Sequence, residues 1–261
     1  MSDELRVERR GRVLVVTIDR QERMNALGQQ MYDELFETWT TLKTDSTIRS
    51  IVITGAGSRA FCTGMDLQAF AERGGPRPVK ADVHEELRVT PLHCDVWLPT
   101  IVAVNGVCTG SGLHFVADAD IAIASDQAWF TDPHVSVGQV SGIEPVSLAL
   151  RVPMSALYRL GLLGRAERWD AQQARELGLV SEVVPADQLL GRAHELAAAI
   201  AASSPAAVRA TREMMRRYES NVLGPWMAAG WDAVQVHWAH PDSQEGPRAF
   251  AERREPKWEN S

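Results

Sequence analysis

The stretch Ile101-Val-Ala-Val-Asn-Gly-Val-Cys-Thr-Gly-Ser-Gly-Leu-His114 decides the fold. Its first four residues are apolar, which indicates a buried strand, and a glycine-rich turn separates them from the short apolar segment 113–117. A turn of this kind at the start of a helix lets backbone N–H groups point outward into a shared site. We therefore expect a strand, a turn and a helix in succession, with chemistry carried at the turn.

The same order of strand, glycine turn and helix recurs along the chain and predicts an α/β fold. Apolar runs indicate two strands within residues 5–19 and further strands at 50–54 and 121–124. Residues 26–43 have helical spacing instead. The residues that would share the buried face of this helix are Leu27, Met31, Leu35 and Leu42.

The last third of the chain is rich in alanine and is helical in pattern. We expect helices over 188–202, 205–218 and 225–239, the second of them starting at a proline. The predicted organisation is therefore an α/β core over residues 1–200 and a helical region over 201–261.

The composition excludes several classes of function. The 261 residues carry 27 Lys and Arg against 34 Asp and Glu, a net charge of −7 without a basic run, which leaves no electrostatic footprint for nucleic acid. No apolar stretch approaches the roughly 20 residues that span a bilayer. Acidic residues follow Met1 where a signal peptide would be basic, and Cys62, Cys94 and Cys108 form an odd, scattered set. We therefore expect a cytoplasmic protein without a disulfide framework and without a Cys/His zinc site.

A second glycine-bearing turn, Ala60-Phe-Cys-Thr-Gly-Met-Asp-Leu67, lies downstream of the strand at 50–54. Neither turn has the spacing of a dinucleotide fingerprint or of a phosphate loop. Side by side, the two turns could aim two N–H groups at one developing oxyanion. Cys62 and Cys108 flank the turns, and we expect both to pack as small residues.

Taken together, these motifs resemble the crotonase family, also called the enoyl-CoA hydratase/isomerase family. The resemblance covers nearly the whole chain. In order, its markers are Asp19-Arg20, Met24-Asn-Ala-Leu27, the two turns, Ala119-Asp-Ile-Ala-Ile-Ala124, the segment 171–184, and Glu245-Gly-Pro-Arg-Ala-Phe-Ala-Glu-Arg-Arg-Glu-Pro-Lys-Trp258. The resemblance implies a crotonase-like spiral of ββα units and a C-terminal helical region that builds homotrimers, often paired as homohexamers.

The resemblance also implies an acyl-CoA thioester as the substrate, with coenzyme A carried as part of it and no separate cofactor or metal. The thioester oxygen would be held by the backbone N–H groups of Met65 and Ser111, where serine replaces the usual glycine. Further residues are expected at the substrate and CoA site by their place in the motifs. They are Arg23, Asn25, Ala26, Ala60, Phe61, Cys62, Asp66, Leu67, Gly110, Phe250 and Lys257.

The chain departs from this family where its hydratases carry two catalytic glutamates. Those positions are His114 and His134. Imidazole can act as acid or base at neutral pH. We expect His114 to lie in the first turn of a helix, whose positive end favours the neutral ring. Asp132 or Glu144 could orient His134.

Three functions remain open. The first is an enoyl-CoA hydratase or isomerase that works through a thioester enolate. The second is a C–C bond hydrolase of β-dicarbonyl substrates that uses His134 and Glu144. The third is an acyl-CoA-binding protein without catalysis. The tail tryptophans also allow two interpretations, core packing or an apolar face for a partner subunit. These residues are Trp226, Trp231, Trp238 and Trp258.

Overall fold

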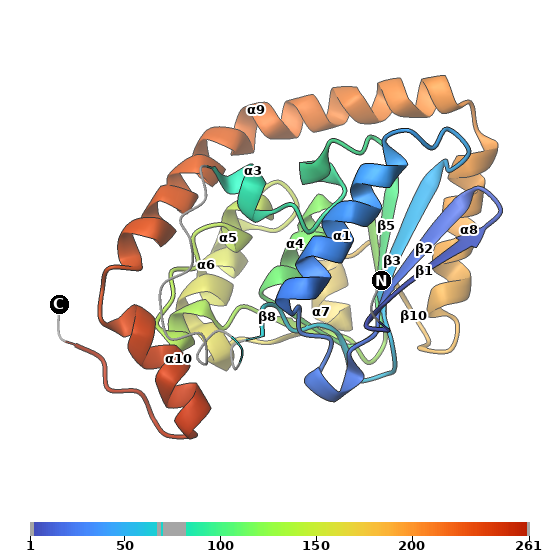
Figure 1. Cartoon of the computed structure of the whole chain (residues 1–261). Helices are drawn as coiled ribbons and strands as arrows, with labels where there is room; N and C mark the ends of the chain where they lie inside the picture. The colour runs from blue at the N-terminus through green and yellow to red at the C-terminus, as the bar shows by residue number, and fades with distance from the viewer. Residues whose placement is uncertain (1–2, 67–68, 70–81, 260–261) are drawn as a thin grey trace.

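The computed structural model describes residues 3–66, 69 and 82–259 and contains a mixed six-stranded sheet (Figure 1). Its order is β1-β2-β3-β5-β7-β10. The strands are β1 (Leu5–Arg10), β2 (Val13–Ile18), β3 (Ser50–Gly55), β5 (Thr100–Val104), β7 (Ile121–Ser125) and β10 (Glu182–Val184). β1 and β2 form an antiparallel hairpin, and all the other neighbours are parallel.

A second sheet explains how the chain winds. Its order is β4-β6-β8-β9, with β4 (Ala60–Cys62), β6 (Val107–Thr109), β8 (Trp129–Thr131) and β9 (Trp169–Asp170). Each of β3, β5 and β7 in the first sheet is followed along the chain by a strand of the second, β4, β6 and β8 respectively. The chain therefore turns repeatedly from one sheet to the other. The expected α/β fold is confirmed.

Helices surround the two sheets. They are α1 (Gln29–Leu42), α3 (Val83–Glu86), α4 (Ser111–Asp118), α5 (Glu144–Ser147), α6 (Met154–Leu163), α7 (Ala171–Glu176), α8 (Leu189–Ala202), α9 (Pro205–His237) and α10 (Asp242–Glu252). Short 3-10 turns lie at η1 (Gln21–Arg23), η2 (Leu92–Cys94), η3 (His134–Val137) and η4 (Gly164–Ala166). Within the described residues, no helix combines the length and the apolar character that a membrane crossing requires.

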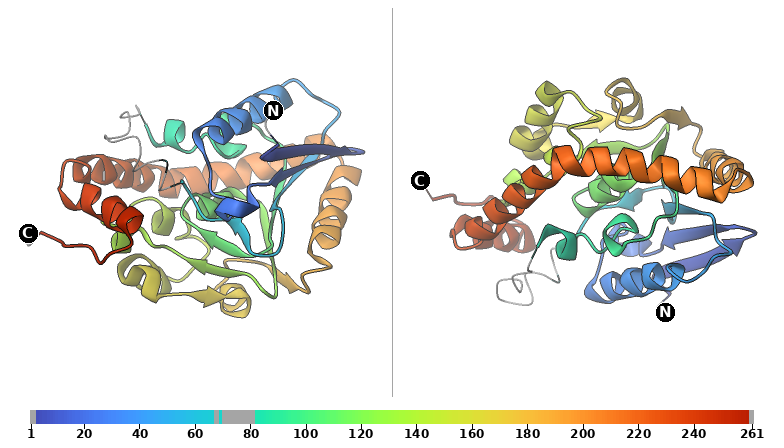
Figure 2. Two further views of the ribbon diagram at one scale, coloured as in Figure 1. Left: turned by 60° about the horizontal axis from the view of Figure 1, so that its bottom comes forward. Right: turned by 90° about the horizontal axis from the view of Figure 1, so that it is seen from above.

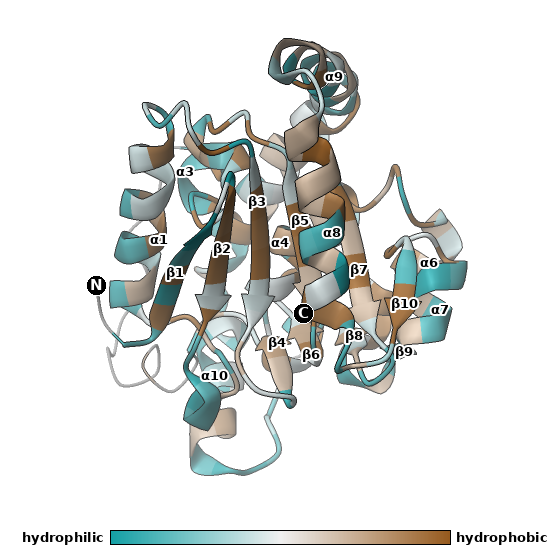
Figure 3. Cartoon of the chain, turned by 90° about the vertical axis from the view of Figure 1, so that its right-hand side faces the viewer, coloured by the Kyte–Doolittle hydropathy of each residue, from teal (hydrophilic) through white to brown (hydrophobic). Residues whose placement is uncertain are grey.

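The central strands β2, β3, β5 and β7 are buried on both faces and are largely apolar (Figure 3). The edge strand β1 is mostly charged and exposed. Met31 and Leu35 of α1 belong to the core on one face, as their spacing predicts. On the other face, α8 brings Ala193 and Ala197 into contact with the cluster that contains Val52. Small alanine side chains let this helix approach the sheet closely.

The tail differs from the expectation of separate helices over 205–218 and 225–239. Both lie in one continuous helix, α9, which carries Pro225 in its interior. A proline removes one backbone hydrogen bond and kinks a helix without necessarily ending it. Seen from above, α9 runs between α1 and α6 (Figure 2), and in Figure 1 it bends along its course. The residues after the proline include Trp231, which is buried against α3 and Ile143.

Candidate active site

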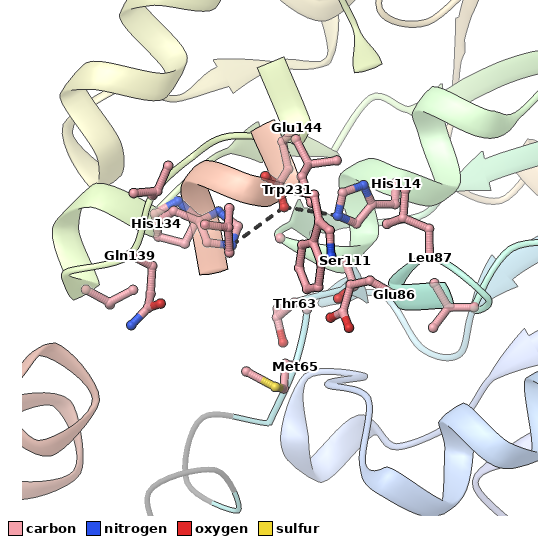
Figure 4. A pocket seen from close by; sticks show the side chains of 18 of the residues that line it. Thr63, Met65, Glu86, Leu87, Ser111, His114, His134, Gln139, Glu144 and Trp231 are labelled. Atoms are coloured by element: carbon pink, nitrogen blue, oxygen red, sulfur yellow. Dashed lines mark ion pairs between the residues drawn. The ribbon is translucent and has the colours of Figure 1, made fainter. Parts of the chain in front are cut away.

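A pocket opens between the two glycine turns, α3, the η3–α5 segment and the second half of α9 (Figure 4). The space inside it, with the open mouth included, is about 1040 Å³. Polar lining residues include Tyr32, Thr63, Glu86, Ser111, His114, His134, Gln139 and Glu144. Apolar ones include Met65, Leu87, Val89, Val137, Val140, Ile143, Trp231, Val234 and Trp238.

The first glycine turn presents the main-chain N–H of Met65 to this pocket. Leu27 N–H donates to Gly64 O at 2.8 Å, and Asp66 N–H donates to Leu27 O at 3.1 Å. This parallel bridge uses the groups on either side of Met65. Because main-chain groups alternate in direction along an extended strand, the N–H of Met65 points away from Leu27.

The second glycine turn places Ser111 beside the first. Ser111 is the first residue of α4, where backbone N–H groups lack partners within the helix. A Cβ added to Gly64 would lie 3.2 Å from the nitrogen of Ser111. Gly64 and Gly110 have φ angles of +87° and +54°, so glycine permits both the backbone conformation and the close approach. The structure thus brings Met65 and Ser111 together on one wall.

A second part of the pocket wall is a chain of imidazoles and carboxylates. His134 Nδ1 lies 2.5 Å from Asp132 Oδ1, and Asp132 is fully buried. His134 Nε2 lies 3.6 Å from Glu144 Oε1, and the same oxygen lies 3.0 Å from His114 Nε2. Glu144, the first residue of α5, is therefore held between the two histidines (Figure 4).

These contacts set the protonation states of the wall. Burial lowers the pKa of His134, but the charges of Glu144 and Asp132 outweigh it and raise this pKa to about 10. Burial raises the pKa of Glu144, but the charges of His134 and His114 hold it well below its usual range. At neutral pH the wall therefore holds an ionised Glu144 next to a protonated His134.

The contacts of His114 shift its pKa in the direction opposite to the one expected. His114 lies in the first turn of α4 as predicted. Burial lowers its pKa, but the charge and hydrogen bond of Glu144, with a further contribution from Asp118, raise it above its ordinary value. A carboxylate at hydrogen-bond distance acts more strongly on the ring than the partial charge of a helix end.

The same wall offers donor atoms of the kind that bind metals. One ligand atom each from Asp132, His134 and Glu144 lies within 4.8 Å of the others. However, the contact of 2.5 Å between Asp132 and His134 is a hydrogen-bond distance, and the second oxygen of Asp132 accepts a hydrogen bond from Ser141. Asp132, His134 and Ser141 are therefore joined in a hydrogen-bonded network.

Several residues expected at the CoA site support its wall from within. Asn25 is buried, and its side-chain amide donates to the carbonyl oxygens of Ala56 and Ala60. Asp66 accepts a hydrogen bond of 2.8 Å from Arg20. Ala26, Phe61 and Cys62 are buried as well, whereas Arg23 is exposed at the end of η1. Leu67 lies outside the described residues.

The cysteines beside the turns pack in the core. Cys62 and Cys108 are both fully buried. Burial raises the pKa of the Cys62 thiol to about 12 and that of Cys108 well above its usual value. Neither thiol ionises at neutral pH, which is consistent with the packing role expected for them.

Phe250 and Lys257 do not line the pocket of their own chain. The ring of Phe250 lies under the guanidinium of Arg165 at 5.5 Å, and the backbone N–H of Lys257 donates to Glu245. Both residues are exposed.

Some residues of the site carry no recognisable signal in the sequence. Tyr32 and Glu86 line the pocket, and Ser141 donates to Asp132 beside it, and all three fall in unremarkable stretches of sequence. Trp231 and Trp238 are seven residues apart, a spacing that places two side chains on one helical face. Their rings pack edge to face at 5.4 Å beside the pocket. Trp231 is buried, which fits core packing, whereas Trp226 is 66% exposed and is free to form part of an apolar face for a partner subunit.

The chain is similar to known proteins over nearly its whole length. A family model described as enoyl-CoA hydratase/isomerase matches residues 8–261. A carnitinyl-CoA dehydratase of Proteus mirabilis is 35% identical over 265 residues, with 99% of both chains covered. An (E)-benzylidenesuccinyl-CoA hydratase of Thauera aromatica is 34% identical over 255 residues, with 94% of both covered. The solved structure of a carnitinyl-CoA hydratase from Mycobacterium avium is similar at a TM-score of 0.84, with 29% identity and 99% of both chains covered.

Proposed function

The chain belongs to the enoyl-CoA hydratase/isomerase family, and from this we propose that it reversibly adds water to an α,β-unsaturated acyl-CoA thioester. The observation that carries the proposal is the position of Glu144. Its carboxylate lies between His114 and His134, in the same pocket as Met65 and Ser111. The relatives described above are named as a dehydratase and a hydratase. Dehydration and hydration are the two directions of one reaction.

In this proposal the two glycine turns bind the thioester oxygen. The N–H groups of Met65 and Ser111 would stabilise the negative charge that develops on that oxygen as the enolate forms. Coenzyme A enters as part of the substrate, without a separate cofactor. Arg23 of one chain, and Phe250 and Lys257 from a neighbouring chain, would contact its nucleotide portion.

The proton transfers would run through Glu144 and His134, and in this proposal His114 and His134 take the positions where the family's hydratases carry two glutamates. Glu144 takes one proton from water as the water oxygen bonds to the β-carbon. The imidazolium of His134 gives a proton to the α-carbon and so quenches the enolate. The proton on Glu144 then passes to His134 and restores the starting state, while Asp132 holds the ring in place. Dehydration is the same path reversed.

The buried Asp132–His134 pair also favours a second candidate, hydrolytic cleavage of a C–C bond in a β-dicarbonyl substrate. A carboxylate that orients an imidazole is the arrangement that activates water as a nucleophile. The water would attack the ketone, and the enolate bound at the two turns would leave.

One panel of substrates distinguishes these reactions. The protein is incubated with crotonyl-CoA, with longer and cyclic enoyl-CoAs, and with a β-diketone thioester, and products are followed by mass. We expect an enoyl-CoA to gain the mass of one water. A chromatographically separate product of unchanged mass would indicate isomerase activity, and two fragments from the diketone would indicate the hydrolase. Binding of every thioester without turnover would overturn the proposal in favour of a non-catalytic acyl-CoA-binding protein.

We also propose that the protein assembles as a homotrimer or a homohexamer. Met154, Tyr158 and Leu162 follow one another at four-residue steps on α6 and are 51%, 61% and 71% exposed. Side chains at this spacing form a single apolar stripe. A second copy of this chain is the partner that would bury it, together with the exposed Trp226 of α9.

The three cysteines suit a cytoplasmic location. Cys62, Cys94 and Cys108 are free thiols, and all three are buried. A reducing compartment keeps thiols in this state.

A further inference from the structure

A tyrosine and a serine form a polar pair on the same wall as the two glycine turns. Tyr32 lies in the first turn of α1, and Ser111 begins α4. The phenol oxygen of Tyr32 lies 3.3 Å from the Oγ of Ser111, and both residues line the pocket. Ser111 therefore offers the pocket both a backbone N–H and a side-chain hydroxyl.

The hydroxyl of Ser111 is not needed to start the helix. Side-chain oxygens commonly cap a helix from the N-cap position, which here is Gly110. The beginning of α4 has no side-chain cap hydrogen bond. Ser111 stands one residue later, and its side-chain hydroxyl lies within hydrogen-bond distance of Tyr32.

We propose that the Ser111 hydroxyl is a third hydrogen-bond donor to the thioester oxygen, and that Tyr32 positions it. The phenol of Tyr32 donates to Ser111 Oγ, which leaves the serine hydrogen directed into the pocket. As the enolate forms, the oxygen accepts hydrogen bonds from two backbone N–H groups and from this hydroxyl. Hydrogen bonds to a charged acceptor are roughly twice as strong as neutral ones. Ser111 is then a catalytic residue and Tyr32 a positioning residue, and the inference rests on the proposed function.

The test measures enolate formation directly, without turnover. Acetoacetyl-CoA is bound to the protein across a pH series, and the ultraviolet absorbance of its enolate gives the apparent pKa of the bound ligand. Donors at the oxygen stabilise the enolate and lower this pKa. A side chain with a merely structural role would change affinity or stability and leave it unmoved.

Three variants are compared with the wild-type protein. Ser111→Ala keeps the backbone N–H and removes only the hydroxyl. We expect it to reduce the enolate fraction at a given pH about tenfold, a rise of about one unit in the ligand pKa. Tyr32→Phe should reduce it about threefold, since the serine hydroxyl is kept but no longer fixed. The double variant should match Ser111→Ala alone, because Tyr32 acts through Ser111.

The control for loss of a phenol is Tyr218→Phe on α9, where the side chain is 65% exposed and does not line the pocket. An unchanged ligand pKa in Ser111→Ala would overturn the third donor while leaving the proposed function intact. Equal and additive effects of the two single variants would overturn the positioning role of Tyr32. If the wild-type protein binds no acetoacetyl-CoA, the proposed function and this inference both fall.

Discussion

At the scale of single residues, Asp132 has the strongest influence on the site, because it holds the ring of His134. Asp132 is fully buried and accepts hydrogen bonds from Ser141 and from the backbone N–H of His134 in addition to its contact with the ring. These bonds fix the orientation of the carboxylate. The ring of His134 can therefore turn only one nitrogen toward Glu144 and the pocket.

Replacing Asp132 with asparagine tests this arrangement. Asp132→Asn removes one of the two charges that raise the pKa of His134, so that pKa should fall from about 10 toward the ordinary value. Titration of the His134 ring by NMR measures the change. Asp187→Asn, at an exposed position, is the matched control and should leave the titration unmoved. A His134 pKa that stays near 10 in Asp132→Asn would show that Glu144 alone sets it.

The shifted pKa values of His134 and Glu144 predict how the free energy of unfolding depends on pH. His134 has a raised pKa in the folded protein, so its contribution is fully present below pH 6.5 and is lost as the pH rises through about 10. Glu144 has a lowered pKa, so its contribution is present above pH 4.5 and is lost as the pH falls below that value. The free energy of unfolding should therefore differ more between wild type and Asp132→Asn at about pH 6 than at about pH 10. Urea unfolding at both pH values checks this, and a difference that grows with pH would contradict it.

At the scale of elements, the position of α4 depends on a close approach between its first turn and β4. A Cβ added to Gly112 would lie 2.5 Å from the carbonyl oxygen of Cys62 and 3.2 Å from the sulfur of Cys108. Neither neighbour can move freely, because one is strand backbone and the other is fully buried. Glycine at position 112 therefore allows α4 to hold Ser111 against the glycine turn that contains Gly64.

Gly112→Ala should thus reduce both the stability and the activity of the protein. We expect a loss of about 2 kcal/mol in the free energy of unfolding, the usual cost of overpacking a close contact. Gly191→Ala is the matched control, because a Cβ there meets nothing within 4 Å and α8 gains helix propensity. It should be neutral or stabilising. Equal stability of the two variants by urea unfolding would contradict the account of α4.

Element boundaries show where sequence reasoning succeeds and where it fails. The apolar runs placed β2, β3, β5 and β7 well, because buried strands of a parallel sheet must be apolar along their length. The break expected before Pro225 was wrong, because tertiary packing of Met227 and Trp231 holds the helix across the proline. Local propensity contains no term for that packing.

At the scale of the whole molecule, the exposed apolar stripe on α6 makes a prediction about assembly. Light scattering should give three or six times the chain mass of 28.8 kDa. Leu162→Glu places a charge in the stripe and should shift the protein toward smaller species, since burying an unpaired charge is costly. Gln172→Glu, exposed on α7, is the matched control. A wild-type protein that is monomeric would contradict the proposed assembly.

The candidate site was predictable in its parts and not in its connections. Met65, Ser111, His114, His134 and Glu144 could all be named from motif order, and the structure brings all five to one pocket. The sequence placed Glu144 beside His134 only as a possible orienting group. Its position between both histidines depends on how α5 packs on α4, which no local pattern encodes. For the same reason the pKa of His114 was predicted in the wrong direction.

The most direct measurement of the proposed mechanism is the rate of water addition to an enoyl-CoA by Glu144→Gln. Glutamine keeps the shape of the side chain and cannot accept the proton from water. We predict that kcat falls by about 100-fold or more while thioester affinity stays within a few fold, and that Glu37→Gln on the exposed face of α1 has no effect. A Glu144→Gln variant that hydrates at nearly the wild-type rate would contradict the account.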